Sequence, residues 1–200
     1  MALKTAEFLF DFGSPNAYLS HRIIPAIEVR TGVKFTYVPV LLGGLFKATN
    51  NRSPMEAFGA VKGKLAYEGL ETRRFVARHS LNAFAPNPHF PVNTLGIMRG
   101  AVAAQSLDVF AAYVEAVYVA MWEKGLKMDD PAVIAQCLTA AGLPVDQLLA
   151  LTADQAIKDR LMANTAAAVE RGVFGSPTFF VGDEMYFGKD RLRDVEEALG

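Results

Sequence analysis

Segments with the sequence patterns of β-strands lie towards the two ends of this 200-residue chain. Near the start, polar and apolar residues alternate over 7–12 and 33–38, and a helical segment that runs to about residue 30 joins them. Near the end, residues 178–181 and 185–187 predict a hairpin, followed by a short amphipathic helix. Paired strands must lie side by side, so we expect one mixed sheet built from both ends of the chain, parallel near its start and antiparallel near its end.

The middle of the chain has the spacing of helices. We expect helices near residues 55–80, 93–105, 107–124, 131–141 and 153–171. Gly43-Gly44 predicts a loop, and Thr152 with Gln155 has the pattern of a capping box. The predicted class is therefore α/β, with a large all-helical insertion. The expected domains are a discontinuous sheet domain of residues 1–40 and 172–200, on which the helix 153–171 also packs, and an insertion domain of residues 41–152.

The composition excludes several kinds of protein. The formal net charge is −1, so no overall field attracts nucleic acid or an anionic membrane. A single cysteine, Cys137, excludes an internal disulfide and a CxxC pair, and the three histidines lack the spacing of a helical metal pair. No apolar run is long enough to span a membrane, and charged residues interrupt the first eleven positions. We therefore expect a soluble protein of the cytoplasm.

The most informative local motif follows the first strand. Gly13 breaks the strand, Ser14 is suited to cap the next helix, and Pro15 suits its first turn. Pro25 inside that helix predicts a kink or a local break. Ser14 could be a cap and nothing more. It could also donate its hydroxyl to an anion, since a helix N-terminus adds free N–H groups and partial positive charge.

A second motif, Ser176-Pro177, precedes the late strand. The order of elements is that of a thioredoxin-like fold, in which this proline has a cis peptide bond and the residue before it offers its backbone to an extended peptide ligand. The alternative is an ordinary loop proline. The positions of a redox Cys-x-x-Cys pair hold Ser14 and Ala17, so disulfide exchange is excluded.

The remaining candidates favour structural roles. Cys137 has apolar neighbours on a predicted helix and reads as a core residue. His21 lies one turn into the first helix and could touch the site, although a structural role is favoured. The side chains of Tyr113, Tyr118, Met121 and Trp122 follow helical spacing and are expected to pack.

Several motifs in this order resemble a known family over nearly the whole chain. The matching pieces are Phe10-Asp11-Phe12-x-Ser14-Pro15-x-Ala17-Tyr18-Leu19, Pro39-Val40-Leu41-Leu42-Gly43-Gly44-Leu45-Phe46, Asn51-x-x-Pro54, Lys64-x-x-Tyr67, Val173-Phe174-Gly175-Ser176-Pro177-Thr178-Phe179 and Phe187-Gly188-x-Asp190-Arg191-Leu192. They resemble the 2-hydroxychromene-2-carboxylate isomerases, which group with kappa-class glutathione transferases in the DsbA-like branch of the thioredoxin fold.

The resemblance implies glutathione as the cofactor and Ser14 as the residue that holds its sulfur as a thiolate. It assigns further cofactor contacts to Asn51, Lys64, Ser176, Pro177, Gly188, Lys189, Asp190 and Arg191. The candidates for binding the substrate carboxylate or other substrate oxygens are Lys47, Asn51, Arg52 and Asn87, with Lys64 as a further cation. By analogy alone, a homodimer is also plausible.

The reaction implied by the resemblance is the glutathione-dependent conversion of 2-hydroxychromene-2-carboxylate, an aromatic carboxylate, to trans-o-hydroxybenzylidenepyruvate. Reversible thiolate addition would turn a double bond into a rotatable single bond. The chain departs from the family pattern at Gly13, Asn16, residues 71–75 and Lys189, which bears on the substrate more than on glutathione. Two alternatives stay open: a kappa-like glutathione transferase or peroxidase, and a non-catalytic thioredoxin-like binding module.

Overall fold

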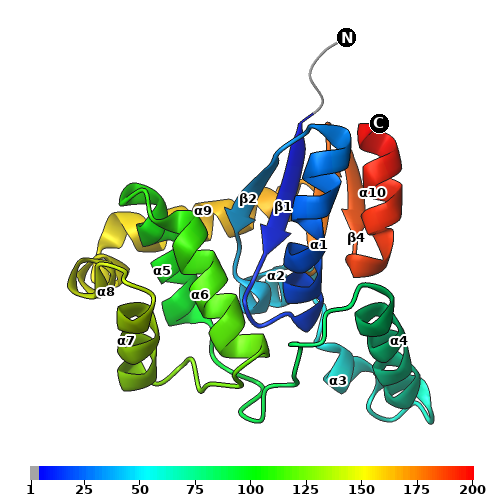
Figure 1. Ribbon diagram of the computed structural model, residues 1–200, viewed down its shortest axis with the longest axis horizontal. Coiled ribbons are helices and arrows are strands. Elements are labelled where there is room, and N and C mark those ends of the chain that lie inside the picture. Colours follow the sequence, from blue (N-terminus) through cyan, green and yellow to red (C-terminus); the bar gives the residue numbers. More distant parts are fainter. Residues whose placement is uncertain (1–4) are drawn as a thin grey trace.

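The computed structural model describes residues 5–200, and its centre is a four-stranded mixed sheet (Figure 1). The strands are β1 (Ala6–Phe10), β2 (Phe35–Pro39), β3 (Thr178–Val181) and β4 (Glu184–Phe187), in the spatial order β2-β1-β3-β4. β1 and β2 are parallel, whereas β1 with β3 and β3 with β4 are antiparallel. The predicted mixed sheet, made from both ends of the chain, is confirmed, and so is the thioredoxin-like class.

The two central strands, β1 and β3, are buried on both faces, and their alternate side chains pack on opposite sides of the sheet. Phe8 of β1 belongs to a large aromatic cluster with Phe10 and Phe179, and this cluster continues into α1 (Pro15–Thr31), α6 (Phe110–Trp122) and α10 (Leu192–Leu199). Leu9 and Phe180 point the other way, into a smaller cluster with residues of α2 (Leu42–Thr49) and α9 (Gln155–Glu170). The helices on the two faces therefore hold the end of β1 in a fixed place.

The first helix begins as the sequence predicts. Ser14 has an extended backbone, its Oγ accepts the N–H of Ala17, and Pro15 occupies the first turn. The helix ends at Gly32, whose φ of 72° is a left-handed conformation that glycine adopts without strain. The expected break at Pro25 is absent, since α1 is continuous through this residue.

The helical middle differs from the prediction in three places. Gly43-Gly44 lies inside α2 instead of a loop, and the helix expected over 55–80 is divided into α3 (Pro54–Phe58) and α4 (Lys64–Arg78). An unpredicted helix, α8 (Val145–Ala153), precedes α9. The other helices of this part are α5 (Leu95–Ser106) and α7 (Pro131–Ala140).

The predicted cap of α9 was wrong. Because α8 continues through Thr152, the hydroxyl of this residue donates to the carbonyl of Leu149 in its own helix. Asp154 caps α9 instead, and its carboxylate accepts the N–H groups of Ala156 and Ile157. α9 also contacts the sheet, since the Asn164 side chain donates to the carbonyl at the end of β2. The division into two domains at the expected boundaries stays a prediction.

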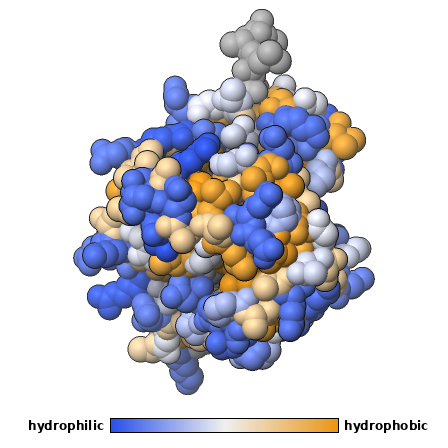
Figure 2. All heavy atoms as spheres, turned by 90° about the vertical axis from the view of Figure 1, so that its left-hand side faces the viewer, coloured by the Kyte–Doolittle hydropathy of each residue, from blue (hydrophilic) through white to orange (hydrophobic). Residues whose placement is uncertain are grey.

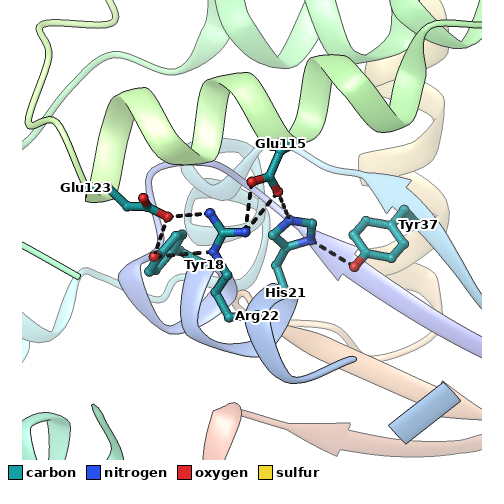
Figure 3. Close-up of polar contacts among 6 residues, drawn as sticks. All are labelled: Tyr18, His21, Arg22, Tyr37, Glu115 and Glu123. Atoms are coloured by element: carbon teal, nitrogen blue, oxygen red, sulfur yellow. Dashed lines mark hydrogen bonds and ion pairs between the residues drawn. The ribbon is translucent and has the colours of Figure 1, made fainter. Parts of the chain in front are cut away.

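A network of polar side chains joins α1 to α6 and β2 (Figure 3). Arg22 donates to both Glu115 and Glu123, and Tyr18 also donates to Glu123. The ring of His21 lies between Tyr37 and Glu115. Its Nδ1 atom is 2.9 Å from the hydroxyl of Tyr37, and its Nε2 atom is 3.1 Å from the carboxylate of Glu115. The structural role expected for His21 agrees with these contacts.

Two negative findings concern residues 5–200 only. Their helices are too short or too polar for any of them to cross a bilayer. Nowhere in this part of the chain do three His, Cys, Asp or Glu side chains gather as metal ligands. The expectation about export rests partly on Lys4, which lies outside the described residues.

Candidate functional site

The two motifs singled out in the sequence meet at the end of β1. The Oγ of Ser14 donates to the backbone carbonyl of Ser176 at 2.8 Å, although 162 positions separate these residues. The Ser176–Pro177 peptide bond is cis, as expected for this fold. Ser14 is 5% exposed, so its hydroxyl lies at the base of the site.

The hydroxyl of Ser14 already uses its single hydrogen within the protein. That hydrogen goes to the carbonyl of Ser176, while Oγ accepts the N–H of Ala17 at 3.2 Å. A serine hydroxyl offers one donor and two acceptor positions. An anion that takes the hydrogen of Ser14 therefore has to displace the Ser176 carbonyl as its acceptor.

Hydrogen bonds on both sides hold the loop before β3. The hydroxyl of Ser176 accepts the backbone N–H of Asp11 at 3.1 Å. The carbonyl of Pro177 accepts the N–H of Gly188, whose φ of 93° is open to glycine without strain. The loop therefore connects the start of α1 to the segment before α10, to which the family resemblance assigns further cofactor contacts.

Asp11 is a buried carboxylate that the sequence analysis left without a role. It accepts the N–H of Gly13 at 2.8 Å, the N–H of Leu42 at 2.7 Å and the hydroxyl of Thr94 at 3.1 Å. Burial raises the pKa of Asp11, and its three hydrogen bonds oppose this change. Asp11 thus ties the Ser14 loop to the first residues of α2 and α5. The sequence signal was a single acidic residue between Phe10 and Phe12, in an otherwise apolar strand end.

Gly13 has no side chain, and the space between Asp11 and Thr94 requires this. A Cβ atom there would lie 3.1 Å from Cγ2 of Thr94 and 3.3 Å from Oδ1 of Asp11. Such contacts are tighter than ordinary van der Waals contacts, so the loop and the start of α5 leave little room for a side chain.

Asn51 reaches the site from the helical insertion. Its side-chain amide donates to the carbonyl of Phe174 at 2.9 Å, two residues before Ser176. Its Oδ1 accepts the N–H of Arg52. The loop between α2 and α3 is thereby attached to the loop that carries Ser176.

The helical insertion also supplies three cationic side chains, which differ in whether a carboxylate already pairs with them. Lys64 pairs with Glu68 at 2.5 Å, and its ammonium lies 5.4 Å from the ring of Phe58. Lys47 and Arg52 are exposed, and no ion pair joins either of them to a carboxylate of residues 5–200. Lys47 and Arg52 are therefore the freer cations.

The segment before α10 contains a buried lysine. The side chain of Lys189 is 4% exposed; its ammonium donates to Asp190 at 2.8 Å and lies 5.1 Å from the ring of Phe75 in α4. Asp190 is largely exposed, and Arg191 pairs with Asp194 at 3.1 Å. The buried ammonium of Lys189 thus fixes the carboxylate of Asp190 through an ion pair, while Asp190 and Arg191 remain exposed to solvent.

Asn87 has to be removed from the candidate substrate-binding residues. Its amide donates to the carbonyls of Met121 and Leu126, and its Oδ1 accepts the N–H of His89. The residue is 6% exposed. Because the amide nitrogen holds the loop against α6 and the turn after it, and Oδ1 bonds the backbone of the loop itself, none of the amide is free to reach a substrate.

These features define a thioredoxin-like protein in which a serine, capping the first helix beside a cis-proline loop, stands in place of redox cysteines. Residues 5–200 match the model of the DSBA-like thioredoxin domain. The chain is 30% identical to a 2-hydroxychromene-2-carboxylate isomerase of Pseudomonas putida, over 97% of this chain and 93% of that protein. It is 24% identical to glutathione S-transferase kappa 1 of Caenorhabditis elegans, over 98% of this chain and 91% of that protein.

Solved structures agree with these relatives. A 2-hydroxychromene-2-carboxylate isomerase structure superimposes with a TM-score of 0.81 at 30% identity, covering 98% of this chain and 94% of that one. A Pseudomonas aeruginosa DsbA variant, at 17% identity and a TM-score of 0.61 over 98% of this chain and 84% of that one, shares the fold. The chain belongs to the DsbA-like proteins and, within them, to the 2-hydroxychromene-2-carboxylate isomerase family of enzymes.

Proposed function

We propose that this protein is an isomerase that uses glutathione to convert 2-hydroxychromene-2-carboxylate into trans-o-hydroxybenzylidenepyruvate. One observation carries the proposal: the hydroxyl of Ser14, at the N-terminus of α1, lies 2.8 Å from the backbone carbonyl before the cis-proline. This places a hydrogen-bond donor and an extended backbone side by side. The names of the relatives supply the substrate and the class of reaction, an isomerisation.

The groups around Ser14 suit the chemistry of glutathione, an extended peptide with a thiol, two carboxylates and an ammonium group. The exposed carboxylate of Asp190 suits the ammonium, and the guanidinium of Arg191 suits a carboxylate. The backbone beside Ser176 suits a peptide in extended conformation. When bound, glutathione supplies a thiolate nucleophile, whose reversible addition to a conjugated carbon permits rotation about the former double bond.

Ser14 changes its hydrogen-bond acceptor in this mechanism. The hydroxyl turns from the Ser176 carbonyl towards the anion, while its oxygen keeps the N–H of Ala17. The N-terminus of α1 adds partial positive charge at the same place. Both effects favour a negatively charged sulfur over a neutral one, which lowers a thiol pKa.

Lys47 and Arg52 are the residues we assign to the substrate carboxylate. Both are exposed, whereas Lys64 is paired with Glu68. A pairing with the carboxylate would fix the orientation of the substrate relative to Ser14.

The test is an isomerase assay with and without glutathione. We expect activity only with glutathione, and a loss of about a hundredfold in kcat/KM for Ser14→Ala, the range seen when one donor to a developing anion is removed. Asp130→Ala is the matched control, since it removes the cap before Pro131 at the start of α7, and should leave kcat/KM unchanged. Equal rates with and without glutathione would contradict the proposal.

The kappa-class relatives favour a second candidate, a glutathione transferase. Mass spectrometry of the products separates the two, because an isomer keeps the mass of its substrate and a conjugate gains that of glutathione. A non-catalytic binding module would yield neither product, even with glutathione bound.

A further inference from the structure

A cavity of about 360 Å³ lies between α5, α7 and α8, and none of the residues that line it is among those assigned to the Ser14 site. Its walls are largely apolar and include Leu95, Met128, Ile134, Leu138 and Leu148. Figure 2 views the side of the molecule on which α8 lies in Figure 1, and apolar surface gathers in the middle of that face within a hydrophilic surround. The volume falls in the range of small-molecule sites.

One cation on the wall of this cavity lacks an anion. Arg99 reaches it from α5, and the buried Nε atom of its guanidinium has no hydrogen-bond partner. Throughout residues 5–200, no carboxylate forms an ion pair with Arg99. A guanidinium stays charged at all physiological pH values, and a partly buried charge without a partner is costly.

Three other polar residues of the lining, Tyr113, Asp129 and Thr152, have partners within the protein. Asp129 lies 3.1 Å from the ammonium of Lys127 and accepts the N–H of Asn93. The hydroxyl of Tyr113 donates to the carbonyl of Ile97, and that of Thr152 donates to Leu149. Among the residues that line the cavity, Arg99 is the cation, and its guanidinium is the group suited to an anionic ligand.

We infer that this cavity binds a small amphipathic monocarboxylate. The planar guanidinium of Arg99 pairs with the carboxylate through two parallel hydrogen bonds, a geometry that suits arginine. The apolar body of the ligand packs against Met128, Leu138 and Leu148. The inference is independent of the proposed isomerase activity, since the two sites share no residue.

The test uses 4-phenylbutyrate as the probe and methyl NMR of the methionines as the readout. Met128 is fully buried and lines the cavity, whereas the sulfur of Met98 accepts the N–H of Phe12 beneath the Ser14 loop. We expect saturable shifts of the Met128 methyl signal. The neutral analogue 4-phenylbutanol should bind about tenfold more weakly or worse, because it lacks the charge.

The variant pair is Arg99→Gln and Arg160→Gln. Both remove one arginine charge, but Arg160 is exposed on α9 and outside the cavity. Arg99→Gln should lower the affinity for 4-phenylbutyrate by about tenfold or more, and Arg160→Gln should leave this affinity unchanged. An unshifted Met128 signal, shifts at Met98 alone, or equal affinities of the carboxylate and the alcohol for the unaltered chain would each overturn the inference.

Discussion

Replacing Gly100 by alanine should destabilise the protein, although alanine is the better helix former. Gly100 lies within α5, where a Cβ atom would come 2.0 Å from the hydroxyl oxygen and 2.7 Å from Cζ of Tyr113 in α6. Tyr113 is 1% exposed, and its hydroxyl donates to the carbonyl of Ile97 at 2.9 Å. The ring can make room only by giving up this hydrogen bond and its packing.

The opposing contributions can be compared in size. Alanine gains about 1 kcal/mol over glycine in a helix interior. Overpacking a core costs about 1–3 kcal/mol, and leaving a buried hydrogen-bonding group without its partner costs about 1–3 kcal/mol. We therefore expect Gly100→Ala to lower the free energy of unfolding by about 1–5 kcal/mol.

Gly96, one turn earlier in α5, provides the matched control. A Cβ atom there meets no heavy atom within 4 Å, so Gly96→Ala should raise the free energy of unfolding by about 0.5 kcal/mol. Urea unfolding followed by the fluorescence of Trp122, which is 3% exposed, measures both variants. A Gly100→Ala variant as stable as Gly96→Ala would refute the packing of α5 against α6 described above.

Three further outcomes follow from particular contacts. Trp122→Phe removes the donor to the buried carbonyl of Phe12 and should cost about 1–3 kcal/mol, measured by circular dichroism in urea. The pKa of Glu115 is lowered to about 2 by its hydrogen bonds, first with the neighbouring imidazole and then with the guanidinium, so the folded chain holds this proton less tightly than the unfolded one. The resulting stabilisation is present above about pH 4.5 and is lost as the pH falls through 2; Glu115→Gln should therefore lose less stability on acidification. Gly13→Ala should destabilise less in a Thr94→Ser background, where the crowding methyl group is gone and the hydroxyl remains, and a double-mutant cycle measures the difference.

The sequence predicts the strands and the serine cap of the first helix because both depend on local chemistry. Ser14 before Pro15 is a cap by its own backbone preferences, and the apolar run Phe8-Leu9-Phe10 fits a strand that is buried on both faces. The meeting of Ser14 with Ser176 is a long-range contact, and it was foreseeable only from the order of elements and the resemblance to a known family.

What the sequence missed depends on tertiary contacts. Gly43-Gly44 disfavours a helix locally, yet α2 forms because its first N–H, that of Leu42, bonds to Asp11. Gly44 also allows a close approach to α9, where a Cβ atom would lie 3.1 Å from Thr165. The amide of Asn87 is polar in a proline-rich loop and suggested a ligand contact, but the backbone of α6, of the turn after it and of its own loop use it completely.

The position of β3 between β1 and β4 determines the order in which the strands of the sheet can pair during synthesis. β1 can pair with β2 as soon as residue 39 has left the ribosome, but its other neighbour begins at residue 178. The carbonyl that receives the hydrogen of Ser14 belongs to residue 176, so it arrives after all the helices of the insertion. A nascent or truncated chain that stops before this point has its serine cap but lacks the carbonyl that the cap faces. The pairing of Ser14 with the cis-proline loop is thus completed only after residues 41–175 have been made and β3 enters the sheet.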